Sequence, residues 1–374
     1  MTSSRLQALH DAGQSLWLDY IDRTMLRNGD LQRRIREDAL TGMTSNPTIF
    51  EKALAEGTAY DEQLGAAPAG LSPWQRFELV ETTDVRSACD IFRGVYDATR
   101  GADGYVSIEV SPGSANDTDA TVDEARRLWK TVDRPNVMIK VPGTAKGAEA
   151  VRRLIAEGIN VNITLLFAVE AHERVIDAYI AGLEERAKAG KPIERVASVA
   201  SFFVSRVDSE VDKRIDAIVA ADPSKGAALG ALKGKAAIAN AKLAYALFQR
   251  KFTGGRWDAL VAKGARVQRP LWASTSTKNP AYRDVMYVEQ LIGPDTVNTL
   301  PPATLDAFRD HGEVKRTVDR DLDAARKVIA DLAAAGISLD DVTAKLLRDG
   351  IASFQKSFDG LLANLEKRAT VAAR

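Results

Sequence analysis

Cysteine and histidine are scarce in this sequence, which contains one cysteine, Cys89, and three histidines among 374 residues. A single thiol excludes a disulfide within the chain and favours a reducing compartment such as the cytoplasm. The histidines, His10, His172 and His311, are widely separated, so no cluster has the spacing of a zinc site. We therefore expect no bound metal, and we expect each histidine to lie at the surface or to support a functional neighbour in a mixed polar setting.

Net charge is also lacking, because 51 lysines and arginines balance 51 aspartates and glutamates. Such a balance provides no overall field that would attract nucleic acid or an anionic membrane. No apolar run approaches the ~20 residues of a membrane span, and the first residues lead into no apolar segment of signal-peptide length. Hydrophobic residues make up 45% of the chain, which is typical of a globular protein with a large core. We expect a cytoplasmic globular protein in which any anion site is local.

Short β-rich runs alternate with longer runs of helical periodicity along the whole chain. Alternating strands and helices indicate parallel βα units, and eight such units predict a closed (β/α)8 barrel, the TIM barrel, before any open sheet. The eight predicted strands cover residues 15–20, 41–46, 105–110, 137–142, 159–166, 196–203, 269–275 and 296–300.

Helical signals support this alternation. Thr144 can cap a helix that Gly158 ends, and the apolar residues between them repeat at helical spacing. Longer helices are expected over residues 72–100 and 227–251, and an amphipathic helix is expected directly after the sixth strand.

The chain shows no internal repeat beyond the βα rhythm and no Pro/Ser-rich linker. Apolar positions beyond residue 319 repeat at helical spacing and predict helices packed on the barrel. We therefore expect residues 1–374 to form one domain, a barrel with helical insertions and a C-terminal helical extension.

One lysine, Lys140, interrupts the apolar run of the fourth predicted strand. Burial of an ammonium group costs several kcal/mol unless the charge is paired, and buried lysines often titrate as neutral amines. A neutral amine is a nucleophile. The alternative is a structural lysine that pairs with a carboxylate or extends to water.

Polar residues occupy one face of several predicted strands. Ser107 and Glu109 alternate with apolar residues on the third strand, Asn162 and Thr164 do so on the fifth, and Lys140 has the same parity on the fourth. Enzymes with this fold carry their chemistry at the carboxyl ends of the strands, so we expect a shared pocket there. Antiparallel strands with one solvated face would also alternate, but the helical runs between the strands argue against them.

A buried lysine among carboxylates and amides suits imine chemistry. Loss of water from a carbinolamine needs a proton donor, for which Glu109 is the candidate, directly or through a water held by Thr164. Cleavage of a carbon–carbon bond beside an iminium needs a base for a hydroxyl proton, and Asp19 at the end of the first strand can serve. Asn46 and Asn162 offer donors and acceptors for a polyhydroxylated fragment. A structural role stays open for each carboxylate.

Two segments have the composition of a phosphate site. Residues 201–206 bring hydroxyls, backbone N–H groups and the guanidinium of Arg206 to the start of the helix after the sixth strand. Residues 274–278 follow the seventh strand and bring hydroxyls and Lys278. Together they predict a phosphosugar substrate. The alternative for Arg206 is a surface ion pair.

With these residues in place, the sequence resembles the transaldolase family. The motifs at residues 42–50, 108–110, 138–144 and 158–167 are similar to those of transaldolases and occur in the same order, and the resemblance is greatest to the longer-chain subfamily. It implies a (β/α)8 barrel that needs no cofactor and transfers a dihydroxyacetone unit in the non-oxidative pentose phosphate pathway. The implied substrates are sedoheptulose 7-phosphate, glyceraldehyde 3-phosphate, fructose 6-phosphate and erythrose 4-phosphate.

The resemblance also implies a role for each candidate residue. Lys140 matches the Schiff-base lysine, and Asp19 matches the acid/base aspartate. Glu109 and Thr164 match the pair that handles the water lost in imine formation. The remaining matches are Asn46, Ser107, Asn162 and Ser201 for the dihydroxyacetone fragment and Arg206 for the phosphate.

One position departs from the pattern of the shorter transaldolases. They carry a second phosphate-binding arginine just after the seventh strand, where this sequence has Ser274-Thr275-Ser276. Lys278 has the same strand parity as Ser276 and is the candidate for the missing charge, with Ser274 nearby. Two other functions would share these residues: a class I aldolase that releases free dihydroxyacetone, and a non-catalytic sugar-phosphate-binding protein. The sequence predicts no oligomeric state and no preferred acceptor.

Overall fold

The computed structural model describes residues 4–55 and 58–372, with side chains described to residue 367. Eight parallel strands pair in chain order, and the eighth pairs with the first to close a barrel. The predicted (β/α)8 barrel is confirmed, and each strand ends within two residues of its expected bounds. The strands are β1 Gln14–Asp19, β2 Leu40–Thr44, β3 Tyr105–Glu109, β4 Val137–Pro142, β5 Val161–Leu166, β6 Ser198–Phe203, β7 Arg269–Ala273 and β8 Thr296–Leu300.

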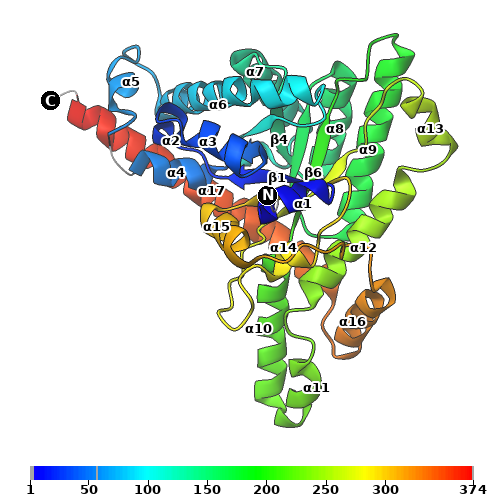
Figure 1. Ribbon diagram of the computed structural model, residues 1–374. Coiled ribbons are helices and arrows are strands. Elements are labelled where there is room, and N and C mark those ends of the chain that lie inside the picture. The colour runs from blue at the N-terminus through cyan, green and yellow to red at the C-terminus, as the bar shows by residue number, and fades with distance from the viewer. Residues whose placement is uncertain (1–3, 56–57, 373–374) are drawn as a thin grey trace.

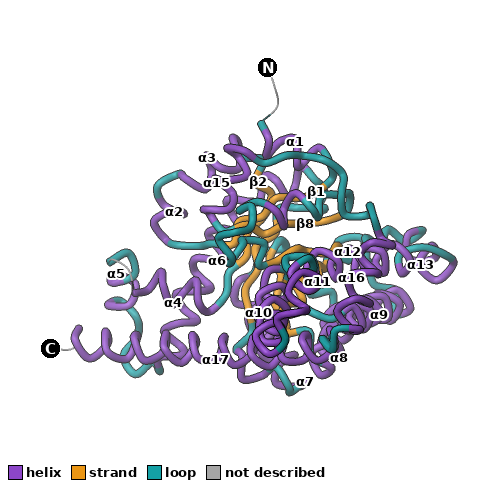
Figure 2. Tube along the Cα trace, turned by 90° about the horizontal axis from the view of Figure 1, so that it is seen from below, coloured by secondary structure: helices purple, strands orange, loops and turns teal. Residues whose placement is uncertain are grey.

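Helices surround the barrel, as Figures 1 and 2 show from two directions. They are α1 Arg5–Asp11, α2 Arg23–Arg27, α3 Asp30–Glu37, α4 Pro47–Ala55, α5 Asp61–Gly65, α6 Pro73–Ala98, α7 Thr118–Val132, α8 Ala145–Glu157, α9 Val169–Lys188, α10 Ser205–Ala221, α11 Gly226–Gly230, α12 Ala236–Lys251, α13 Gly255–Val261, α14 Met286–Glu289, α15 Pro302–His311, α16 Leu322–Ala334 and α17 Leu339–Ala372. The helices expected near residues 72–100 and after the sixth strand are confirmed by α6 and α10.

Helix α8 shows how local sequence determines one βα unit. Thr144 Oγ1 accepts a hydrogen bond of 2.9 Å from the Gly147 N–H at the start of the helix, which satisfies one of its unpaired donors. Gly158 ends the helix with φ near 90°, a left-handed conformation that suits glycine. Val151 and Leu154 are fully buried on one face. The predicted caps and apolar face are therefore confirmed.

The helical stretch expected over residues 227–251 is present but interrupted, because α11 and α12 are separated by residues 231–235. Gly234 lies in this break with φ near 69°, and its N–H donates to Asp212 Oδ1 on α10. A Cβ atom at this position would lie 2.8 Å from the ring of Tyr282. The break therefore follows from a tertiary contact that helical periodicity does not encode.

The expected polar setting of His172 is also wrong. His172 lies on α9 with no exposed surface, and its ring centroid is 5.8 Å from that of Phe202. Neither ring nitrogen has a hydrogen-bond partner in the described part of the chain. Burial lowers the pKa of His172 to about 4. His10 and His311 are solvent-accessible, and Cys89 is a buried free thiol on α6.

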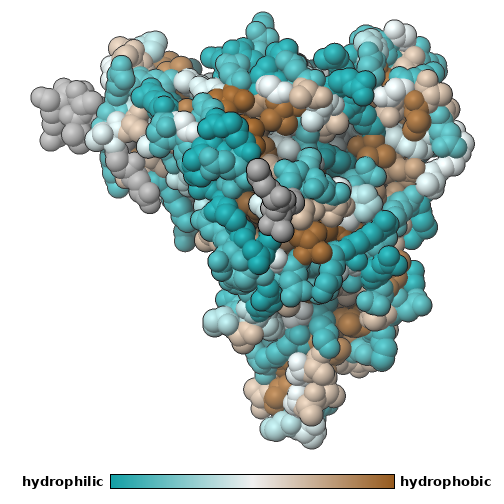
Figure 3. Space-filling model, in the orientation of Figure 1, coloured by the Kyte–Doolittle hydropathy of each residue, from teal (hydrophilic) through white to brown (hydrophobic). Residues whose placement is uncertain are grey.

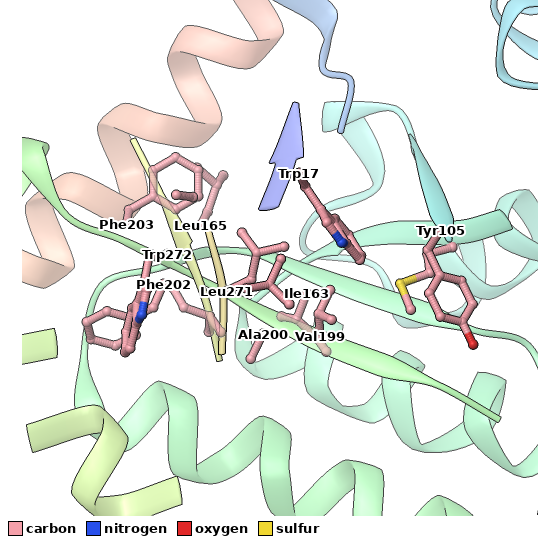
Figure 4. Packing of buried hydrophobic residues seen from close by; sticks show 14 of the residues in the cluster. Trp17, Tyr105, Ile163, Leu165, Val199, Ala200, Phe202, Phe203, Leu271 and Trp272 are labelled. Carbon is pink, nitrogen blue, oxygen red and sulfur yellow. The ribbon is translucent and has the colours of Figure 1, made fainter. Parts of the chain in front are cut away.

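The barrel has an apolar interior beneath its polar end. Trp17, Val199 and Leu271 share the inward parity of their strands and are almost fully buried (Figure 4). Phe202 and Trp272 have the opposite parity and pack edge to face at 6.3 Å between the barrel and its helices. Alternation therefore separates an inner core from an outer one.

Helix α17 crosses the carboxyl end of the barrel. It packs on α4 and α10, and it also contacts the end of β5 and the turn Pro112–Ser114 that follows β3. Figure 1 shows it as the long red helix that runs past the barrel toward α4 and α5. The prediction of C-terminal helices packed on the barrel is confirmed by its apolar side chains. Those that are buried or partly buried are Val342, Leu346, Ile351, Phe354, Phe358, Leu361 and Leu365.

The surface in Figure 3 is predominantly hydrophilic, with hydrophobic residues in small separate patches. Val261 is the one large hydrophobic residue that is exposed in the described part of the chain. Among the helices of residues 4–55 and 58–372, none combines the length and apolar character required to span a membrane.

Candidate active site

A cavity of about 300 Å³ opens at the carboxyl end of the barrel. Its walls come from the ends of most of the strands and from α4, α10 and α17. Eight of the eleven predicted site residues line it. Two of the other three contact one of those eight directly, since Glu109 pairs with Lys140 and Asn162 bonds to Ser201. Ser107 is connected to them through Asn162. The predicted residues that line the cavity are Asp19, Asn46, Lys140, Thr164, Ser201, Arg206, Ser274 and Lys278.

Lys140 and Glu109 form a buried ion pair beside the cavity. They are register partners on β4 and β3, and Lys140 Nζ lies 3.2 Å from Glu109 Oε2. Lys140 Nζ also donates a hydrogen bond of 2.9 Å to the Ser45 carbonyl oxygen. The alternative of a lysine paired with a carboxylate is therefore realised, within a cavity rather than at the surface. Such pairing offsets the cost of burying both charges.

The surroundings of Glu109 change its acidity. Burial raises the pKa of Glu109, and the positive charge of Lys140 opposes that effect. A raised pKa makes the carboxylate a better proton acceptor, and the resulting acid can donate a proton in a later step. The site therefore contains a group suited to both halves of imine formation.

Asn162 is fixed in one orientation by two side-chain hydrogen bonds. Ser201 Oγ donates to Asn162 Oδ1 at 2.6 Å, and Asn162 Nδ2 donates to Ser107 Oγ at 2.9 Å. The backbone oxygen of Ser107 accepts a hydrogen bond from Ser45 Oγ at 2.8 Å. Ser107 and Asn162 are fully buried and do not line the cavity. They connect the wall residue Ser201 to the segment that contacts Lys140.

Thr164 points into the cavity from a bulge in β5. The pairing of β5 with β6 shifts register between Ile163 and Leu166, and Leu165 has φ near 59°. A bulge redirects side chains, and a left-handed leucine costs about 1 kcal/mol. Thr164 Oγ1 is buried and has no hydrogen-bond partner within the described residues. This hydroxyl is therefore free to bind a water or a substrate oxygen.

Asp19 lines the same cavity as Lys140 from the end of β1, and Thr44 and Thr299 lie beside it. Thr44 Oγ1 donates to Asp19 Oδ1 at 2.7 Å, and the hydroxyls of Thr44 and Thr299 lie 2.6 Å apart. Burial raises the pKa of Asp19, while Lys140, the Thr44 hydrogen bond and Arg206 act in the opposite direction. Sequence reasoning missed both threonines, although Thr44 is the register partner of Asp19.

Asn46 stands at the junction of β2 and α4. Its Oδ1 accepts a hydrogen bond of 3.0 Å from the Ile49 N–H and so caps the helix. Because that bond identifies the oxygen, the amide nitrogen is left as a donor on the cavity wall.

Arg206 stacks on an aromatic ring at the cavity wall. Its guanidinium carbon lies 5.2 Å from the centre of the Phe203 ring. Within the described residues it has no carboxylate partner, so the alternative of a surface ion pair for Arg206 is wrong. An unpaired cation at a cavity wall is suited to an anionic ligand.

The loop after β7, residues 274–278, which we call the β7 loop, brings a second cation near Arg206. Lys278 Nζ donates to Ser276 Oγ at 2.7 Å, and Ser274 Oγ lies 2.9 Å from Ser205 Oγ. The N–H of Ser205 donates to the Ser274 carbonyl at 3.0 Å. The N–H of Ser205, one of the backbone donors that the sequence offered to a phosphate, is therefore occupied, and the loop is anchored to the start of α10.

Sequence reasoning also missed cavity residues that come from helices, and two of them matter for the chemistry. Lys52 reaches the cavity from α4, and Phe354 reaches it from α17. The apolar spacing of α17 marked Phe354 as buried but gave no sign that it borders the cavity. No group of three or more potential metal ligands occurs in the described part of the chain.

A barrel with a buried lysine paired to one carboxylate, a second carboxylate in the same cavity and unpaired cations nearby defines an enzyme of the imine-forming class. Residues 16–365 match the family described as Transaldolase/Fructose-6-phosphate aldolase. The chain belongs to this family.

Similarity to individual proteins extends over nearly the whole chain. The sequence is 48% identical to a transaldolase of Trichodesmium erythraeum (strain IMS101), over 98% of each chain. It is 50% identical to a transaldolase of Thermobifida fusca (strain YX), over 96% of each chain. A lysine Schiff base is general in the family, and the shared name of these relatives supports a transferase.

Proposed function

We propose that this chain transfers a dihydroxyacetone unit from sedoheptulose 7-phosphate to glyceraldehyde 3-phosphate, giving erythrose 4-phosphate and fructose 6-phosphate in the non-oxidative pentose phosphate pathway. The observation that carries the proposal is the buried pair of Lys140 and Glu109, of which Lys140 lines a polar cavity together with Asp19. A cytoplasmic location stays a prediction from the sequence.

Imine formation uses the lysine pair. Transfer of a proton from Lys140 to Glu109 leaves a neutral amine and a carboxylic acid, and the burial that raises the pKa of Glu109 favours this state. The amine attacks the C2 ketone, and the acid protonates the hydroxyl of the carbinolamine so that it leaves as water. The free hydroxyl of Thr164 can hold that water.

Carbon–carbon cleavage uses Asp19. The carboxylate accepts the C4 hydroxyl proton as the C3–C4 bond breaks, and the bonding electrons move to the iminium nitrogen to form an enamine. Erythrose 4-phosphate leaves with its new aldehyde. The enamine carbon then attacks the aldehyde of glyceraldehyde 3-phosphate, Asp19 returns the proton, and hydrolysis releases fructose 6-phosphate.

Polar groups around the lysine are assigned to the substrate. Asn46 and Ser201 line the cavity and are assigned to the dihydroxyacetone hydroxyls, and Asn162 with Ser107 is assigned to hold that wall. The phosphate is assigned to Arg206, which has no carboxylate partner among the described residues. Lys278 and Ser274 are assigned to the same phosphate.

Borohydride reduction in the presence of fructose 6-phosphate tests the proposal. Mass spectrometry should find a three-carbon adduct on Lys140, and Lys140→Arg should abolish it. In Asp19→Asn the imine should still form, and the adduct should be the uncleaved sugar phosphate. Undiminished trapping at another lysine would overturn the assignment of the nucleophile.

The acceptor requirement separates transfer from the rival functions. Fructose 6-phosphate should turn over appreciably only when erythrose 4-phosphate is added, because the enamine stays attached to Lys140 until an aldehyde reacts with it. Release of dihydroxyacetone without an acceptor would indicate an aldolase. Binding of the sugar phosphate by calorimetry, with no trapped imine, would indicate a non-catalytic protein.

A further inference from the structure

Three cationic side chains besides Lys140 line the cavity: Arg206, Lys278 and Lys52. They come from α10, the β7 loop and α4. Among the described residues that line the cavity, Asp19 is the one carboxylate. The cavity wall therefore carries an excess of positive charge although the whole chain is neutral.

The three cations lack carboxylate partners in the part of the chain that the structure describes. Lys278 has one hydrogen bond, to Ser276, and Lys52 has no hydrogen bond or ion pair with a described residue. Unpaired cations repel one another, and such an arrangement is suited to a ligand with more than one negative charge. Burial, Arg206 and Lys52 together lower the pKa of Lys278, so the charges interact.

The face of α4 that bears Lys52 is directed at the cavity. Thr48, Ile49 and Lys52 all line it, and Lys52 follows the other two by four and three residues, a spacing that places it on their side of the helix. Phe50 on the opposite side is buried, and its ring packs against Phe77 of α6 at 5.7 Å. Lys52 is therefore oriented by the packing of α4.

Helix α4 is also tied to the C-terminal helix. Thr48 Oγ1 and Ser357 Oγ of α17 lie 2.9 Å apart. A Cβ atom at Gly360 would lie 2.7 Å from Glu51 Oε1, so the two helices are in close contact there. These contacts fix the height of α4 above the barrel and keep its cavity face in place.

The catalytic candidate Lys140 and the lysines proposed for phosphate differ in how deeply they lie in the cavity. Lys140 is 5% exposed, whereas Lys52 and Lys278 are exposed residues at the cavity opening. A ketose phosphate that bonds to Lys140 through C2 would thus direct its far end, which bears the phosphate, toward the opening.

We propose that Lys52 is a phosphate-binding residue that acts together with Arg206 and Lys278 and determines specificity for phosphorylated sugars. Lys52 supplies a positive charge to the cavity from α4. The loop after β7 contributes the uncharged Ser276 to the same cavity. This inference rests on the proposed function, because it assigns the phosphate end of the same substrate.

Lys52→Met tests the proposal by removing the charge while keeping much of the side-chain volume. We expect KM for fructose 6-phosphate to rise about tenfold, since one charge-assisted contact is worth about 1.5 kcal/mol. Inhibition by inorganic phosphate should weaken by a similar factor. Imine formation with dihydroxyacetone, which has no phosphate, should keep its rate. Lys52→Arg should restore KM to within about threefold of the unmodified chain.

Lys213→Met is the matched control. Lys213 lies on α10 and borders a separate groove that also contacts Arg206, so its loss tests for a general charge effect. The proposal is overturned if Lys52→Met leaves KM and phosphate inhibition unchanged, if Lys213→Met has the same effect, or if dihydroxyacetone trapping falls equally. The proposed function fails separately if the unmodified chain traps no dihydroxyacetone on Lys140, and phosphate binding measured by calorimetry still tests Lys52 in that case.

Discussion

Thr44 Oγ1 donates a hydrogen bond of 2.7 Å to Asp19 Oδ1 across the pairing of β2 with β1. This bond stabilises the carboxylate form of Asp19, whereas burial favours the neutral acid. A base that accepts the C4 hydroxyl proton has to be ionised before the bond breaks. Thr44 therefore helps to keep the proposed base in its working state.

Thr44→Val should move the acid limb of the kcat profile to higher pH. Loss of the donor removes an interaction that lowers the pKa of Asp19, so a smaller fraction of the enzyme is ionised at a given acidic pH. The measurement is kcat for transfer as a function of pH. Thr41→Val is the control, because Thr41 lies on the same strand and bonds to the Leu16 carbonyl away from the cavity. An acid limb that stays in place in Thr44→Val would contradict the role of this bond.

Glu109→Gln should slow imine formation by about 100-fold or more, in line with the usual contribution of a positioned acid or base. The amide keeps the shape of the side chain but can neither accept the Lys140 proton nor donate one to the departing hydroxyl. Single-turnover borohydride trapping with dihydroxyacetone measures this step directly.

Glu81→Gln is the matched control for that variant. Glu81 is a second buried glutamate, on α6, and burial raises its pKa well above the usual range, so glutamine resembles the form it already has. Its trapping rate should stay near that of the unmodified chain. Faster trapping in Glu109→Gln would mean that the carboxylate restrains Lys140 rather than assisting it.

Local patterns in the sequence predicted the barrel and much of the site. Alternation of polar and apolar residues has a period of two, so the shared face of Glu109 and Lys140 could be recognised before their 3.2 Å contact was known. The caps of α8 could be read for the same reason, because Thr144 and Gly158 act on their own helix.

The missed features depend on contacts between distant segments. Phe354 borders the cavity because α17 crosses the barrel end, and Lys52 borders it because α4 packs against α17 and, through Phe50, against Phe77 of α6. The break before α12 depends on Gly234 and its contacts with Asp212 and Tyr282. None of these relationships has a periodic signal along the chain, since each is set by packing at long sequence separation.

Buried His172 should make the protein less stable in mild acid. Its pKa is about 4 in the folded chain and ordinarily about 6.5. Between these pH values the unfolded chain therefore binds a proton at His172 and the folded chain does not. The contribution of the neutral His172 ring to the free energy of unfolding is fully present above about pH 6.5 and is lost as the pH falls toward 4. The total loss is roughly 3 kcal/mol, at about 1.4 kcal/mol for each pKa unit.

His172→Leu should remove that part of the pH dependence of the free energy of unfolding, measured by urea denaturation at a series of pH values. Leucine has a similar volume, and no hydrogen bond to a described residue is lost with the ring. His10→Gln serves as the control at an exposed position and should keep the acid slope of the unmodified chain. An unchanged slope in His172→Leu would mean that other groups dominate acid unfolding.

Phe354→Ala should increase the release of free dihydroxyacetone relative to transfer. Phe354 is 5% exposed and covers part of the cavity from α17, where Figure 4 shows a helix passing above Phe203 and Leu165. Helix α17 is in close contact with Leu165, because a Cβ atom added at Gly350 would lie 2.9 Å from the leucine side chain. Removal of the ring admits water, which can protonate the enamine and hydrolyse the resulting imine.

Phe358→Ala separates water entry from simple destabilisation. Phe358 lies one turn further along α17 and packs on Trp74 and Phe77 at 5.0 and 5.9 Å, without lining the cavity. Each alanine variant should lower the free energy of unfolding by roughly 3 kcal/mol, because each removes a buried aromatic ring. Only Phe354→Ala should raise the ratio of dihydroxyacetone release to transfer, by several-fold, when both are assayed under conditions where circular dichroism finds them folded. Equal ratios in the two variants would mean that α17 supports the barrel without shielding the enamine.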